Sequence, residues 1–179
     1  MDRYVAGIDI GSVATKAVVC DGALRIIASC VRPTGWQPRQ AAEEALSRAC
    51  ADAAISTKEL AAIGATGYGR ELPDFATAKA TEVFCQAVGV HHLLPVVRTI
   101  FDIGGQDSKV IKVDEDGHPL DFALNDRCAA GTGRFLEVMA QALGMDIAEL
   151  GQAAVRAAQP CPISSTCTVF AESEVVSLL

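Results

Sequence analysis

Asp9-Ile-Gly-Ser-Val-Ala-Thr-Lys16 and Asp102-Ile-Gly-Gly-Gln-Asp-Ser-Lys109 are two stretches of this chain that repeat one another. They lie within a longer match of residues 7–21 with residues 100–114, at an offset of 93. Each copy is an apolar run that ends in an aspartate, followed by a glycine turn and a second apolar run. The pattern predicts a strand–loop–strand unit that brings backbone N–H groups and a carboxylate to a phosphate chain and its metal. Two such loops on separate lobes favour a nucleotide clamp.

Hydrophobic periodicity extends the repeat to whole lobes. We expect strands at Tyr4–Ile10, Thr15–Cys20, Leu24–Val31, Leu60–Ala65, Arg98–Ile103, Lys109–Val113 and Leu120–Leu124. We expect helices near Arg39–Ala53, Lys79–His91, Arg134–Leu143, Ile147–Ala158 and Val169–Leu179. This order predicts an α/β protein with two similar lobes, residues 1–97 and 98–179. The second lobe is expected to be incomplete, and we interpret the end at Leu179 as a truncation.

Composition excludes several classes of protein. Of the 179 residues 50% are hydrophobic, and 22 acidic against 15 basic residues give a net charge of −7. An acidic chain without a basic run is not expected to bind nucleic acid. No apolar run reaches the roughly 20 residues of a membrane span, and acids near the N-terminus interrupt any signal-peptide core. We therefore expect a cytoplasmic protein with no membrane partner.

In the first loop, Gly11 allows close approach of the backbone to a phosphate, while Ser12 and Thr15 offer hydroxyl groups and Lys16 a positive charge. Asp9 stands where a carboxylate can hold Mg²⁺ through water, since Mg²⁺ usually keeps several waters. The loop does not have the glycine–lysine spacing of a Walker-type phosphate loop. The alternative is a simple glycine–serine hairpin with a surface lysine.

In the second loop, Gly104 and Gly105 can approach the terminal phosphates, and Asp102 and Asp107 offer carboxylates. Gln106 is a candidate for orienting a water molecule for in-line attack. We therefore predict catalytic roles for Asp9, Asp102, Gln106 and Asp107. The alternative here is a Gly-Gly turn with solvated polar residues.

The glycine-rich stretch Asn125–Phe135 precedes an expected helix. Gly131, Thr132 and Gly133 are predicted to leave unpaired N–H groups at the helix start, where the helix dipole favours a phosphate or an anionic metal cluster. Cys128 just before them would gain thiolate character from the same field. The alternative is a glycine-rich loop with an incidental cysteine.

Seven cysteines are many for a reducing compartment. Cys20, Cys30, Cys50 and Cys85 lie in strand or helix patterns, which predicts that they pack in the core. Cys128, Cys161 and Cys167 lie in loops rich in Gly, Pro or Ser, where packing explains them less well. None belongs to a CxxC pair, so spacing alone is weak support for a metal.

Several motifs together resemble one family. They are Asp9-Ile-Gly-Ser, Gly67-Tyr-Gly-Arg70, Asp102–Lys109, Asn125–Glu137 and Cys167-Thr-Val-Phe-Ala-Glu-Ser-Glu174. The chain resembles the activator component of 2-hydroxyacyl-CoA dehydratases, a family that also contains the ATP-binding subunits of benzoyl-CoA reductase. The resemblance implies an actin/Hsp70-like (ribonuclease H-like) ATPase fold. It also implies a homodimer that holds one 4Fe-4S cluster between its subunits, through Cys128 and Cys167 of each, with Cys161 as a bystander.

By this resemblance, ATP and Mg²⁺ would bind between the lobes and change the arrangement of helices at the cluster. The reduced protein would then pass one electron to an acyl-CoA dehydratase or reductase component. The electron would come from ferredoxin or flavodoxin, and a cluster exposed between subunits implies an anaerobic setting. The sequence does not indicate which acyl-CoA the partner handles.

The sequence leaves two alternative functions open. A sugar- or acid-kinase-like phosphotransferase of the same fold would explain both loops but gives Cys128 and Cys167 no role. A non-catalytic, truncated remnant would dimerise and hold the cluster yet bind ATP poorly, because the family continues beyond this chain with a glycine-rich segment that contacts adenosine.

Overall fold

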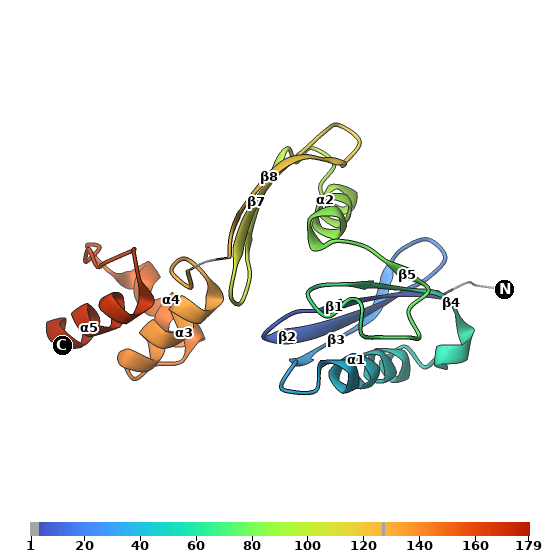
Figure 1. Ribbon diagram of the computed structural model, residues 1–179, viewed down its shortest axis with the longest axis horizontal. Helices are drawn as coiled ribbons and strands as arrows, with labels where there is room; N and C mark the ends of the chain where they lie inside the picture. Colours follow the sequence, from blue (N-terminus) through green and yellow to red (C-terminus); the bar gives the residue numbers. More distant parts are fainter. Residues whose placement is uncertain (1–3, 127) are drawn as a thin grey trace. The chain divides into compact units, whose positions relative to one another are not determined.

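A computed structural model describes residues 4–126 and 128–179, and the described chain divides into two compact units. The first unit contains the chain up to Arg98 together with Val113–Pro119, and the second contains Thr99–Lys112 and Leu120–Leu179. Figure 1 shows the elements of each unit. The boundary between two lobes at residue 97 stays a prediction. No helix in the described ranges is both long and apolar enough to cross a bilayer.

The first unit is built on a mixed sheet with the strand order β3-β2-β1-β4-β5. Its strands are β1 (Tyr4–Ile10), β2 (Ala14–Cys20), β3 (Ile26–Pro33), β4 (Leu60–Thr66) and β5 (Ala78–Lys79). The first three strands form an antiparallel meander, whereas β4 pairs with β1 in parallel, and β5 with β4. The three strands expected in the meander are confirmed, with ends that differ by no more than two residues.

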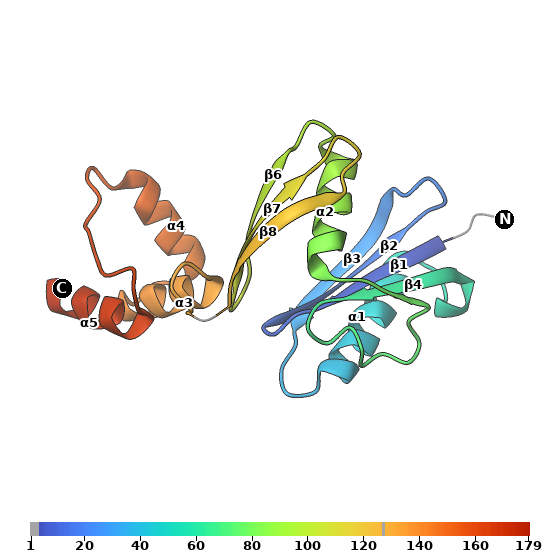
Figure 2. The same ribbon diagram turned by 45° about the horizontal axis from the view of Figure 1, so that its top comes forward.

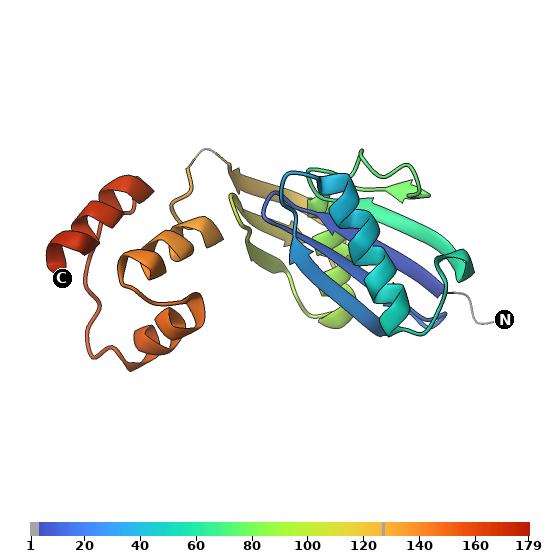
Figure 3. The same cartoon turned by 90° about the horizontal axis from the view of Figure 1, so that it is seen from below.

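One face of this sheet is covered by helix α1 (Pro38–Asp52), which lies across β1, β2 and β3 in Figure 3. The helix presents small side chains at helical spacing, and Ala42, Ala45 and Ala49 are completely buried. They meet alternate residues of the strands, among them Ile8 and Val19. Small side chains let the helix approach the sheet closely.

Two short helices complete the first unit: the 3₁₀ helix η1 (Thr57–Glu59) and helix α2 (Glu82–Leu93). The predicted helix start at Lys79 was wrong, because Lys79 instead pairs with Ala65 in the β4–β5 ladder. The helix begins later because the Thr81 hydroxyl accepts a hydrogen bond from the Phe84 N–H at 3.3 Å, which caps the first turn.

The second unit contains a three-stranded sheet followed by three helices, which Figure 2 separates clearly. The strands are β6 (Thr99–Ile103), β7 (Ser108–Val113) and β8 (Pro119–Asn125), in that order across the sheet. The helices are α3 (Gly133–Ala142), α4 (Ile147–Arg156) and α5 (Thr168–Leu178). Helices α3 and α5 pack through Met139, Ala171 and Val175, with Phe135, Val138 and Ala142 partly buried beside them.

The sequence repeat is also a repeat of hydrogen bonds. Asp21 Oδ1 accepts from the N–H groups two and four residues later, at 2.9 and 3.0 Å, and Asp114 Oδ1 does the same at 2.9 and 2.8 Å. Both turns place the residue three positions on in the left-handed region, with φ 62° at Leu24 and 83° at Gly117. The two hairpins therefore share one turn geometry, with a glycine only in the second.

Candidate functional site

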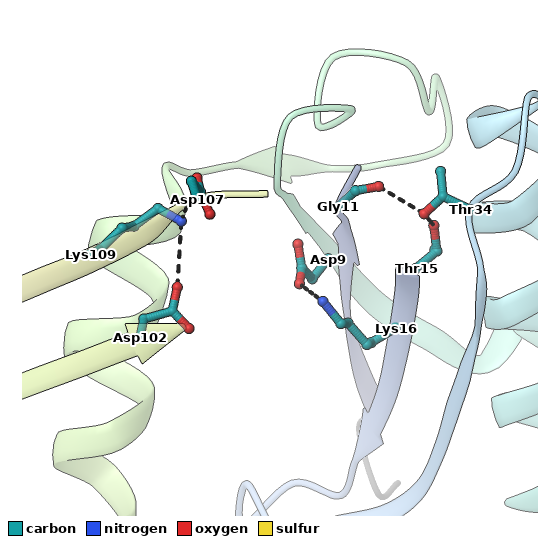
Figure 4. Close-up of polar contacts among 8 residues, drawn as sticks. All are labelled: Asp9, Gly11, Thr15, Lys16, Thr34, Asp102, Asp107 and Lys109. Carbon is teal, nitrogen blue, oxygen red and sulfur yellow. Dashed lines mark hydrogen bonds and ion pairs between the residues drawn. The ribbon is translucent and has the colours of Figure 1, made fainter. Parts of the chain in front are cut away.

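The first loop joins β1 to β2 and brings an acid and a lysine together. Asp9 and Lys16 are directly opposed in the ladder, and Lys16 Nζ lies 2.8 Å from Asp9 Oδ2 (Figure 4). The Gly11 N–H donates to the Ala14 carbonyl at 3.1 Å, which closes the loop. Ser12 at the loop tip is exposed. An exposed hydroxyl, a lysine and an acid at one strand end are the groups expected for a metal–phosphate ligand.

Thr15 does not offer its hydroxyl group at the surface of the loop, as the sequence pattern predicts. Its side chain is completely buried, and its hydroxyl oxygen lies 2.9 Å from the hydroxyl of Thr34, which in turn donates to the Gly11 carbonyl at 2.7 Å. Figure 4 shows this chain of hydrogen bonds. A direct contact of Thr15 with phosphate would require these bonds to break. The structure instead supports a role in holding the loop backbone, shared with Thr34, for which the sequence pattern contains no signal.

The second loop joins β6 to β7 and repeats the arrangement. Asp102 opposes Lys109 in the ladder, and the Gly104 N–H donates to the Asp107 carbonyl at 2.9 Å. Lys109 is 5% exposed, and its Nζ lies 2.9 Å from Asp107 Oδ2 and 3.4 Å from Asp102 Oδ2. Gln106 is exposed at the loop tip. The loop therefore contains one exposed amide and two carboxylates that share a buried ammonium group.

The start of α3 differs from the prediction. The N–H groups of Gly133 and Arg134 donate to the carbonyls of Gly104 and Gly105 at 2.8 and 2.9 Å, and the Thr132 N–H donates to Ala129 at 3.1 Å. These three groups are paired, so the expectation of unpaired N–H groups here was wrong for them. The contact instead fixes the helix start to the second loop. No local pattern predicts this pairing, because its partners lie about thirty residues apart.

A cavity of about 290 Å³ opens in the first unit, on the sheet face opposite α1. Asp9, Lys16, Thr66, Lys79 and Cys85 are among its lining residues. Asp9 Oδ1 is buried and has no hydrogen-bond partner among the described residues. A buried carboxylate oxygen without a partner is costly unless water or a cation satisfies it, so this acid fits a hydrated divalent cation.

The two cysteines predicted as ligands come close together in the second unit. Cys128 Sγ donates to the carbonyl of Thr166 at 3.3 Å, and Thr166 directly precedes Cys167, the N-cap residue of α5. The Ala130 N–H donates to the same sulfur at 3.4 Å. Both thiols are half-buried, whereas Cys161 is exposed. Arg127, within the same motif, lies outside the described residues.

The other cysteines only partly follow the prediction of core packing. Cys50 is buried in α1, and this burial raises the pKa of its thiol. Cys20, Cys30 and Cys85 are half-buried. Burial, together with the neighbouring charge of Asp21, also raises the pKa of the Cys20 thiol. A thiol with a raised pKa stays protonated and is a poor metal ligand, so Cys20 and Cys50 remain packing residues.

Comparison with known proteins identifies the family. The profile of the BadF/BadG/BcrA/BcrD ATPase family matches residues 6–179. The chain belongs to this family. It is 43% identical over 176 residues to the 2-hydroxyisocaproyl-CoA dehydratase activator of Clostridioides difficile, covering 98% of this chain and 66% of that protein. It is 32% identical over 178 residues to one of the benzoyl-CoA reductase subunits of Thauera aromatica, covering 97% and 63%.

Solved structures of family members have the same fold. Component A of the Acidaminococcus fermentans (R)-2-hydroxyglutaryl-CoA dehydratase superimposes with a TM-score of 0.92 at 40% identity, covering 98% of this chain and 67% of that chain. The Clostridium difficile activator with bound ADPNP gives 0.90 at 43% identity, covering 97% and 65%. The actin/Hsp70-like fold implied by the motifs is thus confirmed. This chain spans about two thirds of the length of these relatives.

Proposed function

We propose that this protein is an ATP-hydrolysing activator that passes single electrons to an acyl-CoA dehydratase or reductase component. The observation that carries the proposal is the family membership over residues 6–179, with relatives named as dehydratase activators and as part of benzoyl-CoA reductase. The two acid–glycine–lysine loops support it, since each presents an acid and a lysine at a strand end, which suits a phosphate group and its metal.

For the nucleotide, we assign phosphate contacts to Lys16 and to the backbones of both loops. The binding set is Gly11, Ser12, Lys16, Gly104, Gly105 and Gly131, with Thr15 in support, while the paired N–H groups of Thr132 and Gly133 hold the start of α3. Asp9 would hold Mg²⁺ through water, and its unpartnered Oδ1 favours this role. Asp102 and Asp107 hold Lys109 in place, and exposed Gln106 would orient the attacking water.

For the electron, the donor set fits an iron–sulfur cluster. Cys128 and Cys167 offer two thiols on adjacent backbone segments, and an N–H···S contact such as that from Ala130 stabilises a cluster-bound thiolate. A 4Fe-4S cluster takes four thiolates and, when bound, stores and releases one electron. Two sulfurs per chain therefore require a second chain, which is the basis for proposing a homodimer.

The partners follow from this chemistry. A low-potential electron requires a low-potential donor such as ferredoxin or flavodoxin, and an acceptor that reduces an acyl-CoA. Coupling of ATP binding to electron transfer requires that ATP binds the electron-donating arrangement of the protein more tightly than the resting one. A cluster that bridges two subunits would be open to oxygen, which is the basis for proposing an anaerobic cell, and we propose a cytoplasmic location.

Nucleotide titration of the anaerobically purified chain tests the first half of the proposal. Lys16→Ala should weaken binding of an ATP analogue roughly 10- to 100-fold, since a charged hydrogen bond contributes about 1.5–3 kcal/mol. Lys58→Ala, which removes an exposed lysine from η1, is the matched control and should bind as the unaltered chain does. Equal affinities of the three proteins would contradict the assignment.

Activation of a purified dehydratase component tests the second half. The reduced protein should restore dehydration only when ATP is present, and Cys128→Ala should abolish this effect while Cys161→Ala keeps it. Phosphorylation of a sugar or carboxylic acid by a colourless, iron-free protein would instead identify a phosphotransferase.

A further inference from the structure

Two residues that line one cavity in the first unit each have a buried oxygen atom without a hydrogen-bond partner among the described residues. Asp9 Oδ1 and Thr66 Oγ1 have no hydrogen-bond partner among the described residues, and both residues line the cavity of about 290 Å³. Buried polar atoms are nearly always satisfied by protein or by ordered water. Two such oxygens on paired residues of neighbouring strands therefore point to a polar ligand or a water molecule that binds between them.

Strand pairing explains why the two side chains lie on the same face of the sheet. Asp9 of β1 is in register with Thr66 of the parallel strand β4, so both side chains leave the same face of the sheet. Two residues earlier, Gly7 is in register with Gly64, and both also line the cavity. Two facing glycines leave a space where other residues would fill it. The glycines of both strands therefore help to form the cavity that Asp9 and Thr66 line.

The nearby cations do not satisfy Asp9 Oδ1. Lys16 Nζ binds the other oxygen, Oδ2, at 2.8 Å. Lys79 Nζ is held by Glu71, at 2.9 Å from Oε2 and 3.3 Å from its carbonyl. A carboxylate oxygen only accepts hydrogen bonds, while a threonine hydroxyl can both donate and accept. One water molecule can donate a hydrogen bond to the carboxylate oxygen and form a second one with the hydroxyl.

We propose that Thr66 is a positioning residue for the divalent cation that accompanies a nucleoside triphosphate. Its hydroxyl and Asp9 Oδ1 together hold one water of that cation's hydration shell. This inference rests on the proposed nucleotide-binding function and adds a residue to it. Mg²⁺ dehydrates reluctantly and is often bound through its waters, which suits two oxygens that do not contact each other.

The test compares nucleotide affinity with and without the cation. Thr66→Val keeps the shape of the side chain and removes the hydroxyl, Thr66→Ser restores it, and Thr57→Val is an exposed control. For each protein, the Kd of ADP is measured by calorimetry in excess Mg²⁺ and in excess EDTA. Thr66→Val should reduce the affinity gain from Mg²⁺ about three- to ten-fold, as expected for the loss of one hydrogen bond. Affinity in EDTA should not change, and Thr66→Ser and Thr57→Val should behave as the unaltered chain does.

Each other outcome rejects the inference in a distinguishable way. If Thr66→Val binds ADP as the unaltered chain does in both conditions, Thr66 has no such role, while the proposed function stands. If Thr66→Val loses affinity equally in Mg²⁺ and in EDTA, the residue only supports the pocket. The variant should then also show a lower melting temperature. If the unaltered chain binds no nucleotide in either condition, both the inference and the nucleotide-binding proposal fail for this chain.

Discussion

Gly67 offers a sharp test of how the first loop is held. Its φ is +89°, and a Cβ at this position would lie 2.6 Å from Asp9 Oδ1 and even closer to the Ile10 carbonyl oxygen. Gly67→Ala should therefore suffer two costs. The left-handed backbone costs an alanine about 1–2 kcal/mol. Displacing β1 from the close contact should add about 1–3 kcal/mol, as other overpacking substitutions do.

Gly35 provides the matched control for this prediction. Its φ is +61°, but a Cβ there would meet nothing within 4 Å. Gly35→Ala should thus incur only the backbone cost, about 1–2 kcal/mol. Hydrogen exchange of peptides that cover β1 and β4 measures the local free energy of opening for both variants. If Gly67→Ala is no less stable than Gly35→Ala, the close approach of the two segments is wrong.

Two further predictions concern the repeated turn. Leu24 adopts φ 62° where the second copy has Gly117, and its side chain is exposed, so Leu24→Gly should raise the free energy of unfolding by about 0.5–1 kcal/mol in urea denaturation; a loss of stability would contradict this. The side chain and the backbone N–H of Arg25 hold the pKa of the Asp21 carboxyl below its usual value. Its contribution to stability is therefore present above the unfolded pKa of about 3.9 and is lost as the pH falls through the lower folded value. Asp21→Asn should lower the melting temperature at pH 7. In strong acid, the melting temperatures of the variant and of the unaltered chain should lie closer together. A difference in melting temperature that is the same at both pH values would refute this prediction.

Local pattern was sufficient to predict the longer strands and helices and both strand–loop–strand units, but not β5, η1 or the start of α2. Strands such as Tyr4–Ile10 alternate between faces, and the alanine face of α1 recurs at helical spacing, so each pattern specifies its own structure. Asp9 and Lys16 meet because a short hairpin fixes their register. Information of this kind lies within a few residues of each position.

Contacts between distant segments could not be predicted in this way. Thr15 is close to the first loop in sequence, but its burial depends on Thr34. Thr34 reaches Thr15 only because β3, which ends just before it, pairs with β2. The N–H groups at the start of α3 are paired because the second loop lies against them. Asp9 and Thr66 line one cavity because β4 pairs in parallel with β1. Each depends on tertiary pairing, which a single sequence does not display.

The central claim is that Cys128 and Cys167 of two chains hold one cluster, and its most direct test is the iron and acid-labile sulfide content of the anaerobically purified protein. The account predicts about four iron and four sulfide per dimer in the unaltered chain and in Cys161→Ala. It predicts loss of both in Cys128→Ala, with folding preserved by circular dichroism. Unaltered protein without iron, or a Cys128→Ala variant that keeps its full complement, would contradict it.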